Sequence, residues 1–243
     1  MIQSVNNEYI KSLTKLKQKK YREEAKQFLA EGEHLVQEAI NNHLAVEIFC
    51  LDESKVPQTN CKVTLVSKAV LEKITFSKTP QSMVALCNYK NDCIDFKKAK
   101  RLFILDGLQD PGNIGTIIRT SLAFGFDGII LSEDSVDLYN DKLLRSCQGA
   151  NFYLPILQTN IHQSISELQK NGVSVYATSL RNAKNIEEIQ KVEKMAFVLG
   201  NEGNGVKDST IDLCDGSIYI PISKAESLNV AIAGGIVAFN FRG

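Results

Sequence analysis

Three segments beyond residue 100 of the sequence combine glycines with side chains that could bind or activate a ligand. The first spans residues 110–120 and carries Asn113, Gly115 and Arg119. Gly115 and Arg119 are four residues apart on an expected helix, so they share a face, and the missing side chain leaves room for a phosphate beside the guanidinium. A surface arginine whose stem covers apolar neighbours would show the same spacing.

The second and third segments also follow apolar runs. Residues 200–205 read G-N-E-G-N-G, in which the glycines let the backbone approach a ligand closely while Glu202 projects from the turn. An ordinary glycine-rich turn is the alternative. Residues 220–230 lead into a helix that Ser227 or Asn229 could cap. That helix is apolar almost all round, and Gly234 and Gly235 each cost roughly 1 kcal/mol relative to Ala, which close backbone packing would justify.

The elements that must position these segments alternate between strands and helices. Nearly continuous apolar strands are expected at 102–106, 128–131, 173–178, 194–199 and 217–222, with a helix capped by Asn113 after the first. Such strands, separated by helices, predict a parallel sheet covered on both faces. Ligands of these sheets usually sit beyond the carboxyl ends of the strands.

A smaller α/β unit is expected ahead of this sheet. It would contain a polar helix at 8–30, a second helix at 30–40, a short helix at 67–74 and strands at 46–50, 62–66 and 83–87. The polar stretch 88–100 is the most linker-like part of the chain. We therefore expect two domains, residues 1–95 and 100–243.

Composition narrows the functional class. The 243 residues are 44% hydrophobic, with 28 basic and 28 acidic side chains. This composition is typical of a globular chain and not of a disordered one. The six cysteines form no C-x-x-C pair or metal-ligand spacing, and neither a signal-like start nor a membrane-spanning stretch is present, so we expect a cytoplasmic protein without a metal. Neither G-x-G-x-x-G nor G-x-x-x-x-G-K-[ST] occurs, which argues against a dehydrogenase or a P-loop hydrolase.

Basic residues are concentrated near the N-terminus. They could meet the phosphates of RNA, although a solvated helical face fits the same pattern. The candidate RNA-binding residues are Lys15, Lys17, Lys19, Lys20 and Arg22.

The three segments together carry a family resemblance. N-x-G-x-x-x-R at 113–119, G-N-E-G-x-G at 200–205 and I-P-I…E-S-L-N-V at 220–230 resemble, in order and spacing, the signature motifs of the SpoU (TrmH) RNA ribose methyltransferases. The resemblance covers roughly residues 100–243, and residues 1–90 look like the substrate-binding domain often found ahead of it. The segment 222–226 is one residue shorter than in many members and has no glycine.

The resemblance implies an α/β fold: a parallel-sheet SPOUT methyltransferase domain with a C-terminal trefoil knot, preceded by a small α/β RNA-binding domain. It also implies S-adenosylmethionine as methyl donor and a homodimer in which Arg119 completes the partner's site. By matching motif positions, the catalytic candidates are Asn113, Arg119, Glu202, Ser227 and Asn229. The cofactor-binding candidates are Thr178, Leu199, Gly200, Gly203, Ile220 and Leu228.

The implied reaction is attack of a ribose 2′-hydroxyl on the sulfonium methyl. Because a guanidinium stays protonated, we assign Arg119 to phosphate binding and charge stabilisation rather than to proton removal. Glu202 would order Arg119 or nearby N–H groups, and Ser227 and Asn229 would position the ribose or donor. Ribosomal RNA is the expected substrate; transfer RNA, methylation of a base, and a non-catalytic RNA-binding factor on the same fold are the alternatives.

Overall fold

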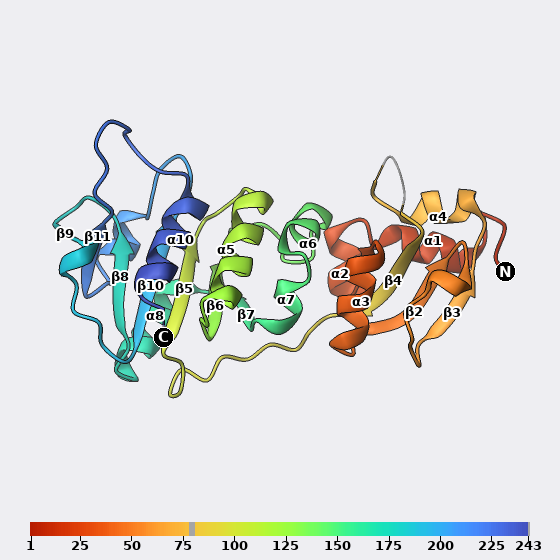
Figure 1. Ribbon diagram of the computed structural model, residues 1–243, viewed down its shortest axis with the longest axis horizontal. Helices are drawn as coiled ribbons and strands as arrows, with labels where there is room; N and C mark the ends of the chain where they lie inside the picture. The colour runs from red at the N-terminus through yellow and green to blue at the C-terminus, as the bar shows by residue number, and fades with distance from the viewer. Residues whose placement is uncertain (78–80, 243) are drawn as a thin grey trace. The chain divides into compact units, whose positions relative to one another are not determined.

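The computed structural model describes residues 1–77 and 81–242 and divides the chain into two compact units (Figure 1). The N-terminal unit comprises residues 1–91 together with 137–152, and the C-terminal unit comprises residues 92–136 and 153–243. No helix among the described residues is long and apolar enough to cross a membrane.

The N-terminal unit is built on a four-stranded sheet with the order β1-β4-β2-β3. In this sheet β2 pairs with β3 in parallel, whereas β4 pairs with both β1 and β2 in the antiparallel direction. The strands are β1 (Gln27–Glu31), β2 (Ala45–Cys50), β3 (Lys62–Leu65) and β4 (Met83–Asn88). The helices are α1 (Glu8–Lys15), α2 (Lys19–Ala25), α3 (Glu33–Asn41), α4 (Lys68–Ile74), α6 (Asp141–Cys147) and α7 (Ala150–Tyr153), with a 3-10 turn at Glu53–Lys55.

The expected single helix over 8–30 is wrong. It is two helices followed by a strand, because Lys26 adopts a left-handed conformation with φ of 53° and ends α2. The next residues pair with β4, where Phe28 lies opposite Cys87. The second helix consequently begins at Glu33, three residues later than its predicted start.

Residues 137–152 complete the core of the N-terminal unit, although the predicted boundary placed them in the second domain. The Tyr139 ring stacks on Tyr89 at 3.8 Å between centroids and lies 4.7 Å from the Phe28 ring. Asp137 forms an ion pair with Arg22, whose guanidinium also donates to the carbonyl of Leu16. Aromatic packing and this buried charge pair explain why the segment belongs here.

The C-terminal unit is a seven-stranded sheet in which every pairing is parallel. Its order is β7-β6-β5-β10-β8-β11-β9. The strands are β5 (Arg101–Asp106), β6 (Gly128–Ser132), β7 (Ile156–Thr159), β8 (Ser174–Thr178), β9 (Ala183–Asn185), β10 (Met195–Gly200) and β11 (Gly216–Tyr219). The other elements are α5 (Pro111–Ala123), α8 (Ile161–Lys170), α9 (Asp208–Ile211), α10 (Val230–Asn240) and a 3-10 turn at Ile186–Glu188.

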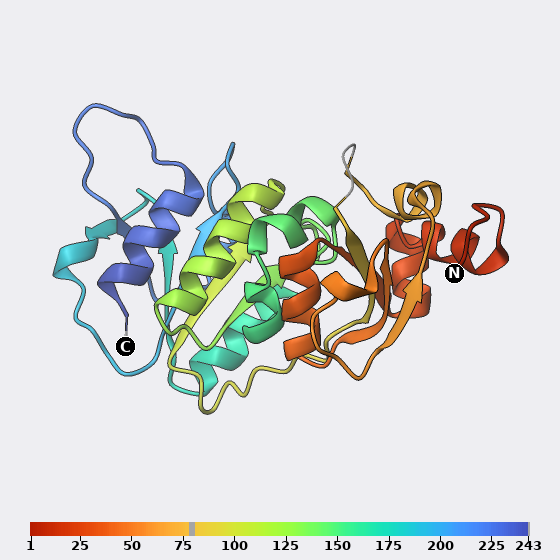
Figure 2. The same ribbon diagram turned by 45° about the vertical axis from the view of Figure 1, so that its right-hand side comes forward.

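Both faces of this sheet are covered, as the apolar strands predicted. Helices α5 and α10 lie side by side over one face in both views (Figures 1 and 2). On that face the rings of Phe103 and Phe197 pack with Phe126 and Phe241. Helix α8 covers the opposite face, where its buried residues join one apolar cluster with Leu102, Ile104, Ile130, Val175, Ala196 and Val198.

The central strands β5 and β10 define a switch point in the sheet. They pair in parallel, and Asp106 at the end of β5 lies opposite Gly200 at the end of β10. The chain leaves β5 toward β6 on one side, whereas it leaves β10 toward β11 on the other. Divergent connections of this kind open a crevice beyond the strand ends, which is the usual ligand position in such sheets.

The Arg22–Asp137 pair yields a stability prediction. Only 6% of the Arg22 side chain and 14% of the Asp137 side chain are exposed, so Asp137→Ala leaves a buried guanidinium without its counter-ion. We expect the free energy of unfolding to fall by about 3–5 kcal/mol. Urea unfolding followed by tyrosine near-ultraviolet circular dichroism measures it.

The matched control is Glu24→Ala, which removes an exposed partner 4.0 Å from Lys20 and should cost less than about 1 kcal/mol. If both variants unfolded at the same urea concentration, the buried pair would not hold the unit together.

Candidate functional site

The loop after β10, residues 201–206, is a tight hairpin at the switch point. Asn201 and Gly205 exchange two backbone hydrogen bonds of 3.0 and 2.9 Å, and the Asn201 Oδ1 accepts from Gly203 N at 2.9 Å. The Asn201 Nδ2 donates to the carbonyl of Gly107 at 2.8 Å. At Gly200 a Cβ would lie only 2.0 Å from backbone atoms of the returning chain, so this fold of the loop requires glycine there.

Three candidate catalytic side chains from three segments form one hydrogen-bonded chain. The Asn113 Nδ2 donates to Glu202 Oε1 at 3.0 Å, and the Asn229 Nδ2 donates to Asn113 Oδ1 at 2.9 Å. Asn229 also caps α10, since its Oδ1 accepts from Ala231 N and Ile232 N. Each amide is therefore oriented by a partner at both ends, and the three loops are held together at the sheet edge.

One of the two expected helix caps is confirmed and the other is wrong. Asn229 caps α10, as one of the two expected candidates. The expected cap at Asn113 is wrong, because Asp110 caps α5 by accepting from Asn113 N at 2.7 Å, with proline at the first helical position. This displacement frees the Asn113 side chain to reach Glu202.

Arg119 and Ser227 do not join this chain. Both are exposed, Arg119 on α5 and Ser227 in the segment before α10. Within the described residues neither side chain makes a hydrogen bond or ion pair. One copy of the chain thus assembles an amide–carboxylate centre and leaves the guanidinium and the hydroxyl outside it.

The cofactor candidates lie around the ends of neighbouring strands. Leu199 and Gly200 are buried at the end of β10, and Thr178 at the end of β8 donates to the carbonyl of Val198 at 2.8 Å. Ile220 directly follows β11, whereas Gly203 is exposed in the hairpin and Leu228 is half-buried just before α10. Strands β10, β8 and β11 are consecutive in the sheet, so their backbone groups face one edge.

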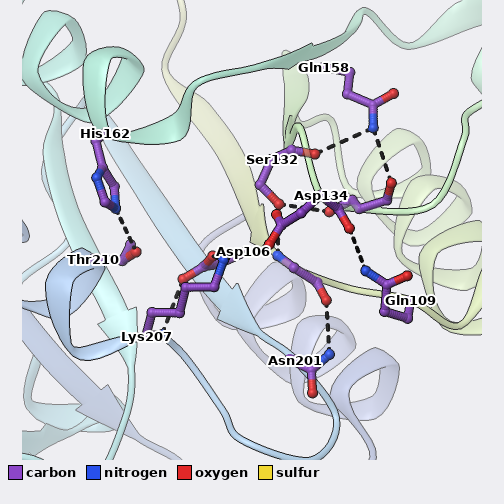
Figure 3. Close-up of polar contacts among 11 residues, drawn as sticks. Asp106, Gln109, Ser132, Asp134, Gln158, His162, Asn201, Lys207 and Thr210 are labelled. Atoms are coloured by element: carbon purple, nitrogen blue, oxygen red, sulfur yellow. Dashed lines mark hydrogen bonds and ion pairs between the residues drawn. The ribbon is translucent and has the colours of Figure 1, made fainter.

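Sequence reasoning missed a charged cluster beside the hairpin, shown in Figure 3. The buried Asp106 carboxylate accepts from Lys207 N at 3.1 Å and lies 3.2 Å from Lys207 Nζ, which also contacts Asp134 Oδ2 at 2.7 Å. The hydrogen bond with Asp134 raises the pKa of Lys207, and the same bond lowers the pKa of Asp134. The sequence signal that could have identified this cluster is Asp106, an aspartate at the end of an otherwise apolar strand.

Polar contacts extend the cluster toward β6. Ser132 Oγ accepts from Gly107 N at 2.8 Å and lies 2.9 Å from Ser135 Oγ. The Gln109 amide donates to the carbonyl of Asp134 (Figure 3). The loops after β5, β6 and β10 are consequently tied to one another. Among the described residues, no three or more His, Cys, Asp or Glu side chains are grouped to hold a metal ion.

The basic candidates in the N-terminal unit differ in accessibility. Lys15, Lys19 and Lys20 are exposed on α1 and α2, and Lys15 and Lys20 place their ammonium groups 5.6 and 5.9 Å from the centre of the Tyr21 ring. Lys17 donates to the carbonyl of Thr75, and partial burial lowers its pKa. Arg22 is only 5% exposed, so its assignment as an RNA contact is corrected: its guanidinium is turned inward to Asp137.

Comparison with known proteins gives two adjoining family matches. The model described as the SpoU rRNA Methylase family matches residues 100–239, and the MRM3-like substrate binding domain model matches residues 7–85. The 23S rRNA (guanosine(2553)-2′-O)-methyltransferase RlmP of Bacillus subtilis is 37% identical over 100% of this chain and 99% of its own length.

Solved structures agree with these matches. An rRNA methyltransferase from Sinorhizobium meliloti with AdoMet bound is 29% identical, with a TM-score of 0.86 over 98% of this chain and 95% of that one. A structure described as a putative RNA methyltransferase of the TrmH family from Porphyromonas gingivalis is 26% identical, with a TM-score of 0.87 over 98% of each chain.

The geometry of the hairpin predicts unequal effects of two alanine substitutions. Gly200→Ala places a methyl group against the backbone of Gly205 and Val206, and we expect a loss of roughly 3 kcal/mol or more of unfolding free energy. Gly203→Ala meets nothing nearer than 3.5 Å and should change it by less than about 0.5 kcal/mol. Equal urea midpoints for the two variants would contradict the observed path of the loop.

Proposed function

The chain belongs to the SpoU rRNA Methylase family, and from this premise we propose that it transfers a methyl group from S-adenosylmethionine to a ribose 2′-hydroxyl of ribosomal RNA. The Glu202–Asn113–Asn229 chain carries the proposal, because it joins all three motif segments at the switch point. The B. subtilis relative, a 23S rRNA (guanosine(2553)-2′-O)-methyltransferase that aligns end to end, supports a guanosine of 23S rRNA as the target. A ribosomal substrate also supports a cytoplasmic location.

The strand ends suit the methyl donor, which supplies an electrophilic methyl group on a sulfonium. Ile220 and Leu228 flank residues 221–227, a segment whose side chains are all exposed. The backbone of Gly200, Ile220 and Leu228 would hold the donor, together with Thr178, Leu199 and Gly203. A trefoil knot fits the path of the chain, since after β11 it returns to pack α10 against α5 and β10.

The residues of the centre would position the ribose rather than perform covalent chemistry. The Asn113 Nδ2 carries two N–H groups and gives one to Glu202, so the other can donate to a ribose oxygen. Glu202 holds that amide in place, while Asn229 fixes its other end and Ser227 can reach the ribose or donor. Near-attack placement of the hydroxyl against the methyl is the main contribution expected from such a site.

RNA would be held by two kinds of cation. The guanidinium of Arg119 would bind a phosphate and stabilise developing charge. The exposed Lys15, Lys19 and Lys20 would attract the RNA backbone at the substrate-binding domain, with Lys17 at their margin.

A homodimer is part of the proposal. Ile232, Ile236 and Phe239 follow one another along α10 and are 55%, 36% and 57% exposed, and Leu122 on the adjoining α5 is 39% exposed. A Cβ at Gly235 would meet nothing, so this apolar face also has room for a close approach. A second copy of this face would cover it and bring Arg119, three residues from Leu122, toward the partner's site.

Methyl transfer is the direct test. The purified protein, labelled S-adenosylmethionine and total RNA from a strain lacking the gene should yield 2′-O-methylguanosine in 23S rRNA. Asn113→Ala, which breaks both links of the hydrogen-bonded chain, should lower kcat about 100-fold. Label in transfer RNA or in a methylated base would overturn the substrate assignment, and RNA binding without donor binding in calorimetry would indicate a non-catalytic factor.

Dimerisation is tested separately. Ile236→Glu puts two symmetry-related carboxylates into the proposed interface, so we expect dimer affinity to fall about 100-fold or more and methyl transfer to fall with it. Val192→Glu, at a 39% exposed position outside α10, is the matched control. A fully active monomer in sedimentation would contradict the role of the second subunit.

A further inference from the structure

We propose that Lys207 is a positioning residue for the reaction: its ammonium, held between Asp106 and Asp134, clamps the hairpin 201–206 and thereby sets the position of Glu202. The inference deepens the proposed function and rests on it for its kinetic consequences. Lys207 lies outside the three signature segments and touches none of the candidate catalytic side chains.

The hairpin is fixed to its surroundings at both ends. At its start, Asn201 Nδ2 reaches the carbonyl of Gly107, and at its end Lys207 N donates to Asp106 Oδ2. Asp106 lies opposite Gly200 in the sheet register, and the two anchors bind the chain where β5 ends, at Gly107 and at Asp106 itself. Glu202 projects from between the two anchors and receives Asn113 from the opposite side. A shift of either anchor therefore moves Glu202 relative to Asn113.

The charge balance makes the Lys207 anchor the stronger constraint. Asp106 is 0% exposed, and within the described residues its Oδ1 accepts no hydrogen bond and forms its one ion pair with the Lys207 ammonium, at 3.2 Å. A buried carboxylate that loses its counter-ion must take up a proton or move toward water. Either response weakens the hold on the end of the hairpin, because Asp106 is also the acceptor for Lys207 N and a charged acceptor binds an N–H more strongly than a neutral one.

Asp134 orients the ammonium from the solvent side. Its side chain is 56% exposed, so its ion pair contributes less than the buried contact. It nevertheless joins the loop after β6 to the cluster, since its own carbonyl accepts from Gln109 (Figure 3). The clamp therefore fixes the ends of three neighbouring strands, β6, β5 and β10, relative to one another. The last of these, β10, leads into the loop that carries Glu202.

Steady-state kinetics of the full chain distinguish a positioning role of Lys207 from direct binding of RNA, which a half-exposed lysine could also perform. We expect Lys207→Met to lower kcat about 10–100-fold with KM for RNA within about twofold, because a displacement near 1 Å at Glu202 misaligns the centre. Lys207→Arg, which keeps the charge, should recover most of the rate. A raised KM with unchanged kcat would identify a phosphate contact and overturn the clamp. Lys191→Met, at an exposed lysine outside the cluster, is the control.

A double variant tests whether Lys207 acts through Glu202. If it does, Lys207→Met combined with Glu202→Ala should be no slower than Glu202→Ala alone. If the two substitutions lowered kcat by independent factors that multiply in the double variant, the proposal would be overturned. Asp134→Asn, which leaves Asp106 paired, gives a milder variant should Lys207→Met fold poorly, and it should show a smaller loss of kcat with the same masking by Glu202→Ala.

A measurement without RNA keeps the clamp distinct from the proposed function. The side-chain amide of Asn113, observed by nuclear magnetic resonance in the 15N-labelled full chain, should shift in Lys207→Met and Asp134→Asn and stay in place in Lys191→Met. An unchanged Asn113 resonance in Lys207→Met would overturn the clamp even if the protein methylates RNA. A shifted resonance in a protein that transfers no methyl group would support the clamp while contradicting the proposed function.

Discussion

The parallel pairing of β5 with β10 is the constraint on which the functional part of the molecule depends. It places Asp106 opposite Gly200, and the chain departs from these two residues in opposite directions. Two loops must therefore share the space above one pair of strand ends. They do so because Gly200 has no side chain to separate them and because the carboxylate of Asp106 binds the returning loop through Lys207.

This arrangement explains why two kinds of polar contact lie on opposite sides of the hairpin in the C-terminal unit. The side facing α5 and α10 holds Asn113, Glu202 and Asn229 in neutral and anionic hydrogen bonds. The side facing β6 holds the charged cluster of Lys207 with its two carboxylates. The hairpin lies between them, so one segment of backbone connects the ionic cluster to the hydrogen-bonded centre.

The sheet and much of the centre could be predicted because their signals are local. Apolar runs mark strands buried on both faces, and residues following such runs meet at one edge of a parallel sheet. That logic brings Asn113, Glu202 and Asn229 near one another. It fails where a distant partner decides the outcome: the burial of Arg22 depends on Asp137, more than a hundred residues away, and nothing near Arg22 marks it as buried.

Other differences between the predicted and observed elements arise where neighbouring residues give competing local signals. Both Asp110 and Asn113 can cap a helix, and Pro111 at the first helical position decides for Asp110. The strand at 27–31 was hidden because its apolar centre is short and follows a highly charged helix, and only the left-handed Lys26 separates the two. Arg119 and Ser227 remain apart from the centre because a single chain offers them no partner among its described residues.

The membership of residues 137–152 in the N-terminal unit affects how the protein is made. A ribosome releases residues 1–91 before the segment that supplies Tyr139 and Asp137, and it must also complete β5, α5 and β6 in between. Until that segment is synthesised, Phe28 lacks its contact with Tyr139 and Arg22 lacks its ion pair with Asp137. The family matches at 7–85 and 100–239 follow one another along the sequence, whereas the two units are interleaved, so the N-terminal unit cannot complete its core until the chain has been synthesised to residue 152.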